Sequence, residues 1–512
     1  MTFKKELDRR HRFSLNVVSN YAAKLWGVAS IYVFVPLYVN HLGIDAYGLI
    51  AFNAIVLAIL YIADAGLSQS FSREAAKSEA GQGLLDLFTS IERVLLFILL
   101  LVCSIFLIMC PFIAENWLDK TGILSEYEVQ HSLWLMGISV VPQVMMSLYF
   151  GGLMGLQYQV SANVIWIAFG IIRSGIVLVP IYFLPDVRVF FAWQIASATI
   201  MTLIMRHTLR SHLLKAIGPP ANRIAVGFFS WSALNSIRAY AAGMFGMSII
   251  AALNMQIDKV VVSFTLPLDV FAEYALVSAL AQLPIILTLP IASALLPRLT
   301  SIIHDKSRHG ELTALYSNTT YYIASIATTA GVALCLFLPD VVTLWMHGKS
   351  FDGDALQAGR LLTVGSLLMA LQLAPFQLSL ANGHVATNVR LGATILVISV
   401  PSQVILTGAY GLVGAAVPWL VLNFFASIFL GIALNKRFPV VQLRQWLFKD
   451  IVPSFVCAPF FLVLARCASY ALDADALLSC GIAAFGTLVA IGSLYHWRHR
   501  GGDKVALEQR AS

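Results

Sequence analysis

The sequence predicts an all-α membrane protein with about 14 transmembrane helices, arranged as two pseudo-symmetric six-helix lobes and a C-terminal helix pair. Three observations support this class. First, hydrophobic residues make up 59% of the 512 residues, charged residues only 12%, and the mean hydropathy is +0.81. Such a composition leaves too little polar surface to cover a water-soluble fold. The other two are the spacing of the apolar segments and an internal repeat.

Apolar segments of about 20 residues, the helical length that crosses a hydrocarbon core of about 30 Å, recur along the whole chain. The first follows basic residues, as in a signal peptide, but it is too long for the apolar region of one and lacks a clear small-residue cleavage site. We therefore expect a retained first helix. The predicted spans are residues 13–37, 47–69, 91–114, 132–153, 163–184, 189–205, 244–266, 271–296, 321–338, 361–380, 391–407, 412–434, 451–470 and 477–497.

Lys and Arg residues gather on one side of the predicted spans. The side that holds both termini carries 23 of the 33 basic residues and the opposite side carries four. Short cytoplasmic loops accumulate Lys and Arg, so both termini are predicted to be cytoplasmic. Residues 206–223 (RHTLRSHLLKAIGPPANR) contain four cations and a Pro-Pro pair, and are therefore predicted to be a cytoplasmic hinge loop outside the hydrocarbon.

The hinge divides the chain into an N-terminal lobe (1–205, the first six spans) and a C-terminal lobe (224–435, the next six). An extra helix pair (450–497) and a basic cytoplasmic tail (498–512) follow. Because each lobe has an even number of spans, two copies would insert in the same orientation and be related by a pseudo-two-fold axis along the membrane normal. A cavity between the lobes is the predicted binding site.

The two lobes resemble each other at an offset of about 225 residues. Similar residues recur at four separate places, which favours a repeat over the chance that Asp, Trp and Asn are common at helix ends. The matching pairs are Asp45 and Asp269, Arg73 and Arg298, Trp117 and Trp345, Gln157 and Asn382, and Asn163 and Asn388.

Six short segments resemble the polysaccharide exporters of the MOP (multidrug/oligosaccharidyl-lipid/polysaccharide) superfamily. Those of the first lobe are similar to the opening signature of these exporters, and those of the second lobe to its repeat. The resemblance extends over most of the chain, from about Phe13 to Leu434. The segments are LGIDAYGL (42–49), DAGL (64–67), REAA (73–76), QIDK (256–259), EYA (273–275) and LPRL (296–299).

This resemblance implies a MATE/MOP-like fold and a Wzx-type lipid flippase. Such a protein moves undecaprenyl-pyrophosphate-linked oligosaccharide across the bacterial inner membrane for O-antigen and lipopolysaccharide, capsule or exopolysaccharide synthesis. It implies a transporter rather than an enzyme, with lipid-linked oligosaccharide, membrane lipids and polysaccharide polymerase machinery as partners. The last two spans resemble the additional helix pair of MurJ, whereas drug exporters of the superfamily typically have twelve spans.

Cations inside the spans are the candidate substrate-binding residues. Arg173 and Lys24 lie about midway along their predicted spans, and Arg238 precedes a Tyr-Ala-Ala segment that also occurs beside Lys24. An ionisable group at bilayer depth is costly and indicates a functional site, and buried cations would suit an anionic headgroup such as pyrophosphate. Each cation also has a structural alternative: Arg173 could pair with an acid, Lys24 could snorkel, and Arg238 could lie at the interface.

Two aspartates are candidates for a coupling-ion site that would take H⁺ or Na⁺; no other cofactor and no metal is expected. Asp258 is adjacent to Lys259, so a buried ion pair is its alternative role. Asp64 lies near the C-terminal end of its span, where the helix dipole disfavours an anion. We expect a compensating cation there, and fold maintenance as the first role.

Other function classes are weaker. A cation-coupled drug antiporter would share the fold but would need acids, and the first six spans hold only Asp64 well inside, against Lys24 and Arg173. A membrane glycosyltransferase or polymerase would need a metal site, and the DxD-like segments 352–354 and 473–475 lie in short external loops. The cations lie between spans, which excludes nucleic-acid binding. The six cysteines have no metal-ligand spacing and are expected to pack in spans.

Overall fold

The computed structural model describes residues 2–64, 66–77, 81–117, 124–217, 228–438, 440 and 443–511. Every regular element in these ranges is a helix, and 13 helical stretches are long and apolar enough to cross a membrane. One of them, Ala386–Ala433, has 48 residues and is kinked at Tyr410 and Gly411. This helix is about 72 Å long, which is enough to cross a membrane twice. The described residues therefore contain the 14 membrane spans that the sequence predicts. The predicted fold class is confirmed.

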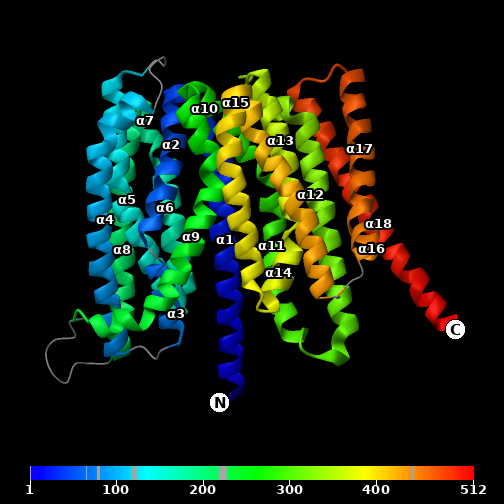
Figure 1. Ribbon diagram of the computed structural model, residues 1–512, viewed down its shortest axis with the longest axis horizontal. Coiled ribbons are helices and arrows are strands. Elements are labelled where there is room, and N and C mark those ends of the chain that lie inside the picture. The colour runs from blue at the N-terminus through cyan, green and yellow to red at the C-terminus, as the bar shows by residue number, and fades with distance from the viewer. Residues whose placement is uncertain are drawn as a thin grey trace. The chain divides into compact units, whose positions relative to one another are not determined.

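The two halves of the chain repeat one order of helices: a long helix, a broken helix, two more spans and an antiparallel pair. The first half has α1 (Thr2–Leu42), α2 (Ile44–Leu60), α3 (Leu67–Lys77), α4 (Gln82–Asn116), α5 (Glu126–Gly155), α6 (Gln159–Gly170), α7 (Leu178–Phe183) and α8 (Val187–Ile217) (Figure 1). The second half has α9 (Trp231–Thr265), α10 (Leu268–Ala281), α11 (Leu283–Ile302), α12 (His309–Trp345), α13 (Gly353–Leu371), α14 (Leu373–Ala381) and α15 (Val385–Arg437). The C-terminal helices are α16 (Leu443–Gln445), α17 (Val452–Ala471) and α18 (Ala476–Ala511).

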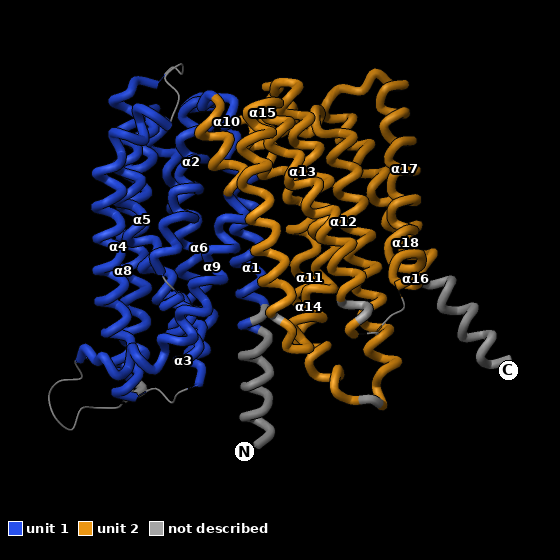
Figure 2. Tube along the Cα trace, in the orientation of Figure 1, with its two compact units in different colours: residues 1–256, 267–272 blue, residues 257–266, 273–512 orange. Residues whose placement is uncertain are grey.

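The chain packs as two compact units, which Figure 2 shows in different colours. The first unit comprises Met1–Gln256 and Pro267–Ala272, and the second comprises Ile257–Leu266 and Glu273–Ser512. These units reflect packing rather than the internal repeat. The lobe boundaries proposed from the sequence therefore stay predictions.

The predicted hinge loop is partly wrong. Residues 206–217 continue α8 as helix, and residues 218–223 lie outside the described ranges. Arg206 Nε lies 2.6 Å from Glu92 Oε1 of α4, and this counter-charge allows a cation to lie within a packed helix. The predicted basic tail likewise continues α18 as helix up to Ala511.

The C-terminal helix pair packs against α12 in the second unit. Ala458 and Leu462 of α17 and Ala490 of α18 form a small buried cluster with apolar side chains of α12. Arg498 Nη1 of α18 lies 2.9 Å from the fully buried carboxylate of Asp450, which also accepts a hydrogen bond from Ser317 of α12. Van der Waals packing and charged hydrogen bonds together attach the pair to the second half.

Small residues of α5 allow α3 to pack closely in the first unit. A Cβ atom on Gly152 would lie 2.6 Å from Phe71 Cε1 of α3, and one on Gly151 would lie 3.2 Å from the Ser68 carbonyl oxygen. Glycine is thus favoured at Gly152, because a Cβ atom there would force the side chains of Phe71 and Leu209 to move. This packing places Ser68 of α3 beside Ser147 of α5.

Candidate functional site in the first unit

The second span is broken at its C-terminal end. α2 gives way to a 3₁₀ turn over Tyr61–Asp64, and the next helix, α3, begins at Leu67. Gly66, at the break, has a φ of +72°, and a Cβ atom there would lie 2.7 Å from the Ala241 carbonyl oxygen of α9. Only glycine combines this left-handed backbone with so close a helix contact. The predicted continuous span 47–69 is therefore interrupted.

Because of the break, the Asp64 carboxylate accepts hydrogen bonds from the first turn of α3. The backbone N–H of Ser68 donates to both carboxylate oxygens at 3.3 Å, and the Ser68 hydroxyl donates to Oδ1 at 2.5 Å. We expected a cation to compensate Asp64, and this was wrong for the described residues. The carboxylate faces a helix N-terminus, whose dipole favours an anion, instead of only the unfavourable C-terminus of α2.

A cavity of about 410 Å³ opens beside Asp64 within the first unit. Its polar lining consists of the Asp64 carboxylate together with hydroxyl and amide groups from three other helices. Such a set of oxygen atoms suits a small hard cation or a proton better than an anion. The polar lining residues are Tyr61, Asp64, Ser68, Gln69, Ser72, Ser147 and Ser248.

Tyr61 connects this cavity to Arg173. Its ring lines the cavity, and its hydroxyl donates to the Gln143 carbonyl oxygen at 3.1 Å. The buried Gln143 side chain accepts a hydrogen bond from Arg173 Nη1 at 3.4 Å, and Tyr61 lies within electrostatic range of both Arg173 and Asp64. We name Tyr61, Asp64, Gln143 and Arg173 the polar cluster. It brings together two of the five residues that the sequence predicted.

Arg173 lies in a π-helical segment, Ile171–Ile176, inside the fifth span. Carbonyl groups of three successive residues in this segment accept hydrogen bonds from neighbouring helices. The donors are Trp193 Nε1 to Ile172 at 2.9 Å, Gln194 Nε2 to Arg173 at 3.3 Å and Tyr38 Oη to Ser174 at 2.5 Å. In a membrane, such side chains satisfy the backbone groups that an irregular helix frees, and π-segments often occur at functional sites.

The guanidinium of Arg173 has no carboxylate partner among the described residues. Its nearest polar contact is Gln143, and it lies over the ring of Phe169 at 5.3 Å from the ring centroid. The structural alternative, an ion pair with an acid on a neighbouring helix, is therefore not observed in this part of the chain. Arg173 is half-buried and is available for an anion, because a cation inside a span is unfavourable without a counter-charge.

Lys24 and Arg238 lie outside the polar cluster. Lys24 is exposed on α1, and Arg238 is exposed near the start of α9. Within the described residues neither forms a hydrogen bond or an ion pair. Both belong to the first unit, so they add positive charge to the body that holds Arg173.

Asp258 belongs to the second unit and is ion-paired. Its carboxylate lies 3.1 Å from Lys259 Nζ and accepts a hydrogen bond from the buried Tyr274 hydroxyl at 3.0 Å. Neighbouring residues on a helix point about 100° apart, but the long lysine chain bends back to reach the carboxylate. The ion pair that the sequence left open is thus present, and Asp258 is less available to a coupling ion than Asp64.

The two DxD-like segments cap helices. Asp352 Oδ1 accepts a hydrogen bond from the Gly353 N–H at the start of α13, and Asp475 Oδ1 accepts one from the Leu478 N–H at the start of α18. N-cap preference explains these aspartates without a metal. Within the described ranges, no group of three His, Cys, Asp or Glu side chains could hold a metal ion, and the six cysteines are free.

Sequence reasoning missed most of the residues that hold the π-segment and the cavity. Tyr38 lies on α1, Trp193 and Gln194 lie on α8, and all three bond to carbonyl groups of another helical segment, so no local pattern marks them. Ser68 and Ser147 were missed because isolated serines are common in membrane helices. The Asp-Ala-Gly-Leu-Ser sequence at residues 64–68 is a signal that was available, because an aspartate followed by glycine and serine is typical of a helix N-terminus.

Comparisons with known proteins identify the family of the chain and its fold. A family model described as "Polysaccharide biosynthesis protein" matches residues 15–303, which is more than half of the chain. None of the curated proteins compared with the sequence matches it.

Solved membrane transporters share the fold. The inward closed structure of lipid II flippase MurJ matches with a TM-score of 0.71 and 11% identity, over 94% of this chain and 99% of that one. An inward-facing multidrug resistance MATE family transporter of the MOP superfamily matches with a TM-score of 0.60 and 17% identity, over 81% and 95%. The Vibrio cholerae MATE transporter VcmN matches with a TM-score of 0.56 and 14% identity, over 84% and 99%. The MOP-type fold predicted from the sequence is confirmed.

Proposed function

Because the chain belongs to the polysaccharide biosynthesis protein family, we propose that it is a flippase for lipid-linked oligosaccharide. The passenger is an undecaprenyl-pyrophosphate-linked repeat unit, moved from the cytoplasmic to the periplasmic leaflet of the bacterial inner membrane. The product enters synthesis of O-antigen, capsule or exopolysaccharide, where polymerase machinery uses it. In this proposal both termini are cytoplasmic and the protein is a transporter rather than an enzyme.

The observation that carries the proposal is the uncompensated guanidinium of Arg173 inside the fifth span. A pyrophosphate is an anion with several acceptor oxygens, and arginine can donate two parallel hydrogen bonds to such a group. The passenger then supplies the counter-charge that the described residues do not. Lys24 and Arg238 extend the cationic path, and transport proceeds by alternating access through a cationic cavity.

The membrane potential favours this direction of transport. With the cytoplasm negative, an anionic headgroup is driven outward by about 2.3 kcal/mol per elementary charge and 100 mV. A coupling ion, H⁺ or Na⁺, can add to this force. Asp64 is the better site for that ion, because several hydroxyl and amide groups lie in its cavity whereas Asp258 is already paired with Lys259. A broken helix that lines a cavity is the usual place for such an ion in transporters.

A complementation experiment tests the flippase. Cells that lack their own flippase gene receive the wild type, the double variant Arg173→Ala with Lys24→Ala, or a control with Arg298→Ala and Arg444→Ala. The control removes two exposed cations that are not in the proposed path. We expect the wild type and the control to restore surface polysaccharide and the double variant to fail at equal amounts of protein in the membrane. Full export by the double variant would contradict the role of these cations.

A cation-coupled drug antiporter is the second candidate, and the acidic cavity beside Asp64 is the observation that favours it. The purified protein distinguishes the two. Stabilisation against thermal unfolding by lipid-linked sugar, but not by an organic cation, supports the flippase. The opposite result supports the antiporter.

A further inference from the structure

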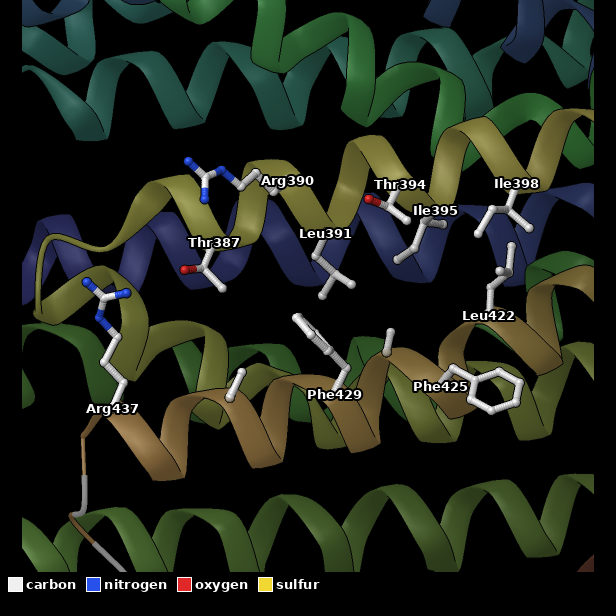
Figure 3. Close-up of a pocket in the computed structure, with 12 residues that line it drawn as sticks. Thr387, Arg390, Leu391, Thr394, Ile395, Ile398, Leu422, Phe425, Phe429 and Arg437 are labelled. Atoms are coloured by element: carbon white, nitrogen blue, oxygen red, sulfur yellow. The ribbon is translucent and has the colours of Figure 1, made fainter.

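A groove lies between the two arms of α15 in the second unit. The arms, residues 385–409 and 412–437, are antiparallel because the chain reverses at the kink, and the groove has a volume of about 490 Å³. Figure 3 shows Leu391 of the first arm and Phe429 of the second facing each other across it. Most of its lining is aliphatic or aromatic. The groove is separate from the polar cluster, which belongs to the first unit.

Two arginines lie at one end of this groove. Arg390 is near the beginning of the first arm and Arg437 is the last residue of the second, so the antiparallel arms bring both to the same end (Figure 3). Both side chains are exposed, and neither forms an ion pair or a hydrogen bond with another described residue. Thr387 adds a hydroxyl group at this end. The groove is therefore cationic at one end and mainly apolar over the rest.

The length of the apolar part matches one leaflet of a bilayer. The apolar lining rises about 11 Å along the first arm, from Leu391 to Ile398, and about 17 Å along the second arm, from Ala433 to Leu422. One leaflet of the hydrocarbon core is about 15 Å thick. An acyl chain that begins at a phosphate near the arginines would thus end within the groove.

We propose that this groove binds an anionic glycerophospholipid of the cytoplasmic leaflet. The phosphate accepts hydrogen bonds from Arg390 and Arg437, and one acyl chain lies between the arms against Leu391 and Phe429. The leaflet follows from the sequence, because the arginine end belongs to the side on which Lys and Arg gather. Charge complementarity and the one-leaflet length favour a phospholipid over a longer polyprenyl carrier. The proposal does not depend on the flippase function.

Native mass spectrometry of the full-length protein in detergent tests the site. The protein is titrated with phosphatidylglycerol and, separately, with phosphatidylcholine that carries the same acyl chains. The variant Arg390→Gln with Arg437→Gln is compared with Arg298→Gln with Arg444→Gln, which removes two exposed arginines that do not line the groove. A third variant, Ala433→Trp, fills the groove and keeps both arginines.

We expect the wild type to prefer phosphatidylglycerol, and the Arg390→Gln, Arg437→Gln variant to bind it about thirtyfold more weakly. Ala433→Trp should also weaken binding, whereas the Arg298→Gln, Arg444→Gln control should bind as the wild type does. Equal binding of both lipids by the wild type, or undiminished binding by either groove variant, would overturn the proposal. It would also be overturned if undecaprenyl phosphate, rather than phosphatidylglycerol, were the lipid whose binding depends on the two arginines.

Discussion

The two halves of the chain repeat the same order of helices but differ in how the charges inside their spans are paired. At an offset of about 225 residues, Arg173 of the first half corresponds to Ile398, and Asp64 corresponds to Leu289. Among the described residues, Arg173 and Asp64 have no opposite charge beside them. In the second unit, by contrast, the three paired carboxylates that are buried or half-buried all have cations beside them: Asp258 with Lys259, Asp340 with Arg466, and Asp450 with Arg498.

This difference separates two uses of charge in a membrane. A carboxylate paired with a cation is structural, because each group offsets part of the cost of burying the other, and the pairs Asp340–Arg466 and Asp450–Arg498 also join different helical segments. A charge inside a span that has no partner is unfavourable unless a ligand or an ion supplies the opposite charge. The first half also contains one such pair, Glu92 with Arg206, but its Arg173 and Asp64 are left for a ligand or an ion to compensate, as the proposed function requires.

The largest expected effect comes from breaking a pair in the second unit. Arg498→Met leaves the fully buried Asp450 carboxylate without its cation, and removal of one partner of a buried pair costs about 3–5 kcal/mol. We expect the free energy of unfolding of the purified protein to fall by about this amount. Denaturant titration in detergent measures it.

The control for this variant is Arg498→Met combined with Asp450→Leu. Replacing both partners by apolar residues removes the uncompensated charge, so most of the lost stability should return. If Arg498→Met alone unfolded like the wild type, the pair would have no role in attaching α18 to the second half.

The next effect concerns the unpaired arginine of the first half. Arg173→Ile gives the first half the residue that the second half has at this place, Ile398. A hydrogen bond to a charged group contributes about 1.5–3 kcal/mol, so we expect transport to fall roughly 10- to 100-fold. Stability should change little or rise, because the variant removes a half-buried cation that has no counter-charge among the described residues.

Surface polysaccharide and unfolding are measured on the same variant. Arg173→Lys is the matched control, since it keeps the charge but not the planar guanidinium, and it should retain part of the transport. A large loss of stability in Arg173→Ile, with transport lost in proportion, would show a structural role and would remove the contrast between the halves.

Much of the fold could be predicted from the sequence, because the lengths of the apolar segments and the positions of the basic loops are local properties of the sequence. The site was predicted only in part. Arg173 and Asp64 were found because a charge inside an apolar span is conspicuous, but the partners of each were not. Tyr38 and Gln194 contact Ser174 and Arg173 from other helices, so their role depends on helix packing. The break near Asp64 was missed because its residues remain apolar enough to continue a span.

A smaller effect tests how the halves connect their last two spans. In the second half Gly411 has φ +57° and ψ −137°, whereas Leu184 in the corresponding link of the first half has φ −133°. Gly411→Ala should cost about 1–3 kcal/mol through backbone strain alone, since a Cβ atom there would meet nothing within 4 Å. Gly408→Ala, one turn earlier in the helix and equally unobstructed, should instead be neutral or slightly stabilising. If the two variants had the same free energy of unfolding, a side chain at position 411 would not strain this link.

The smallest effect lies in the corresponding link of the first half, where Asp186 accepts hydrogen bonds from Arg188. These bonds lower the pKa of Asp186 from its ordinary value of 3.8. A lowered pKa stabilises the fold above the ordinary value, and this stabilisation is lost as the pH falls through the lowered pKa. Both side chains are about one-third exposed, so the pair should contribute only about 0.2–1 kcal/mol. Asp186→Asn should therefore unfold slightly more easily than the wild type near neutral pH and equally in strong acid, as a series of unfolding curves against pH would measure. A difference that grew toward acid would reverse the sign and contradict the assignment of this ion pair.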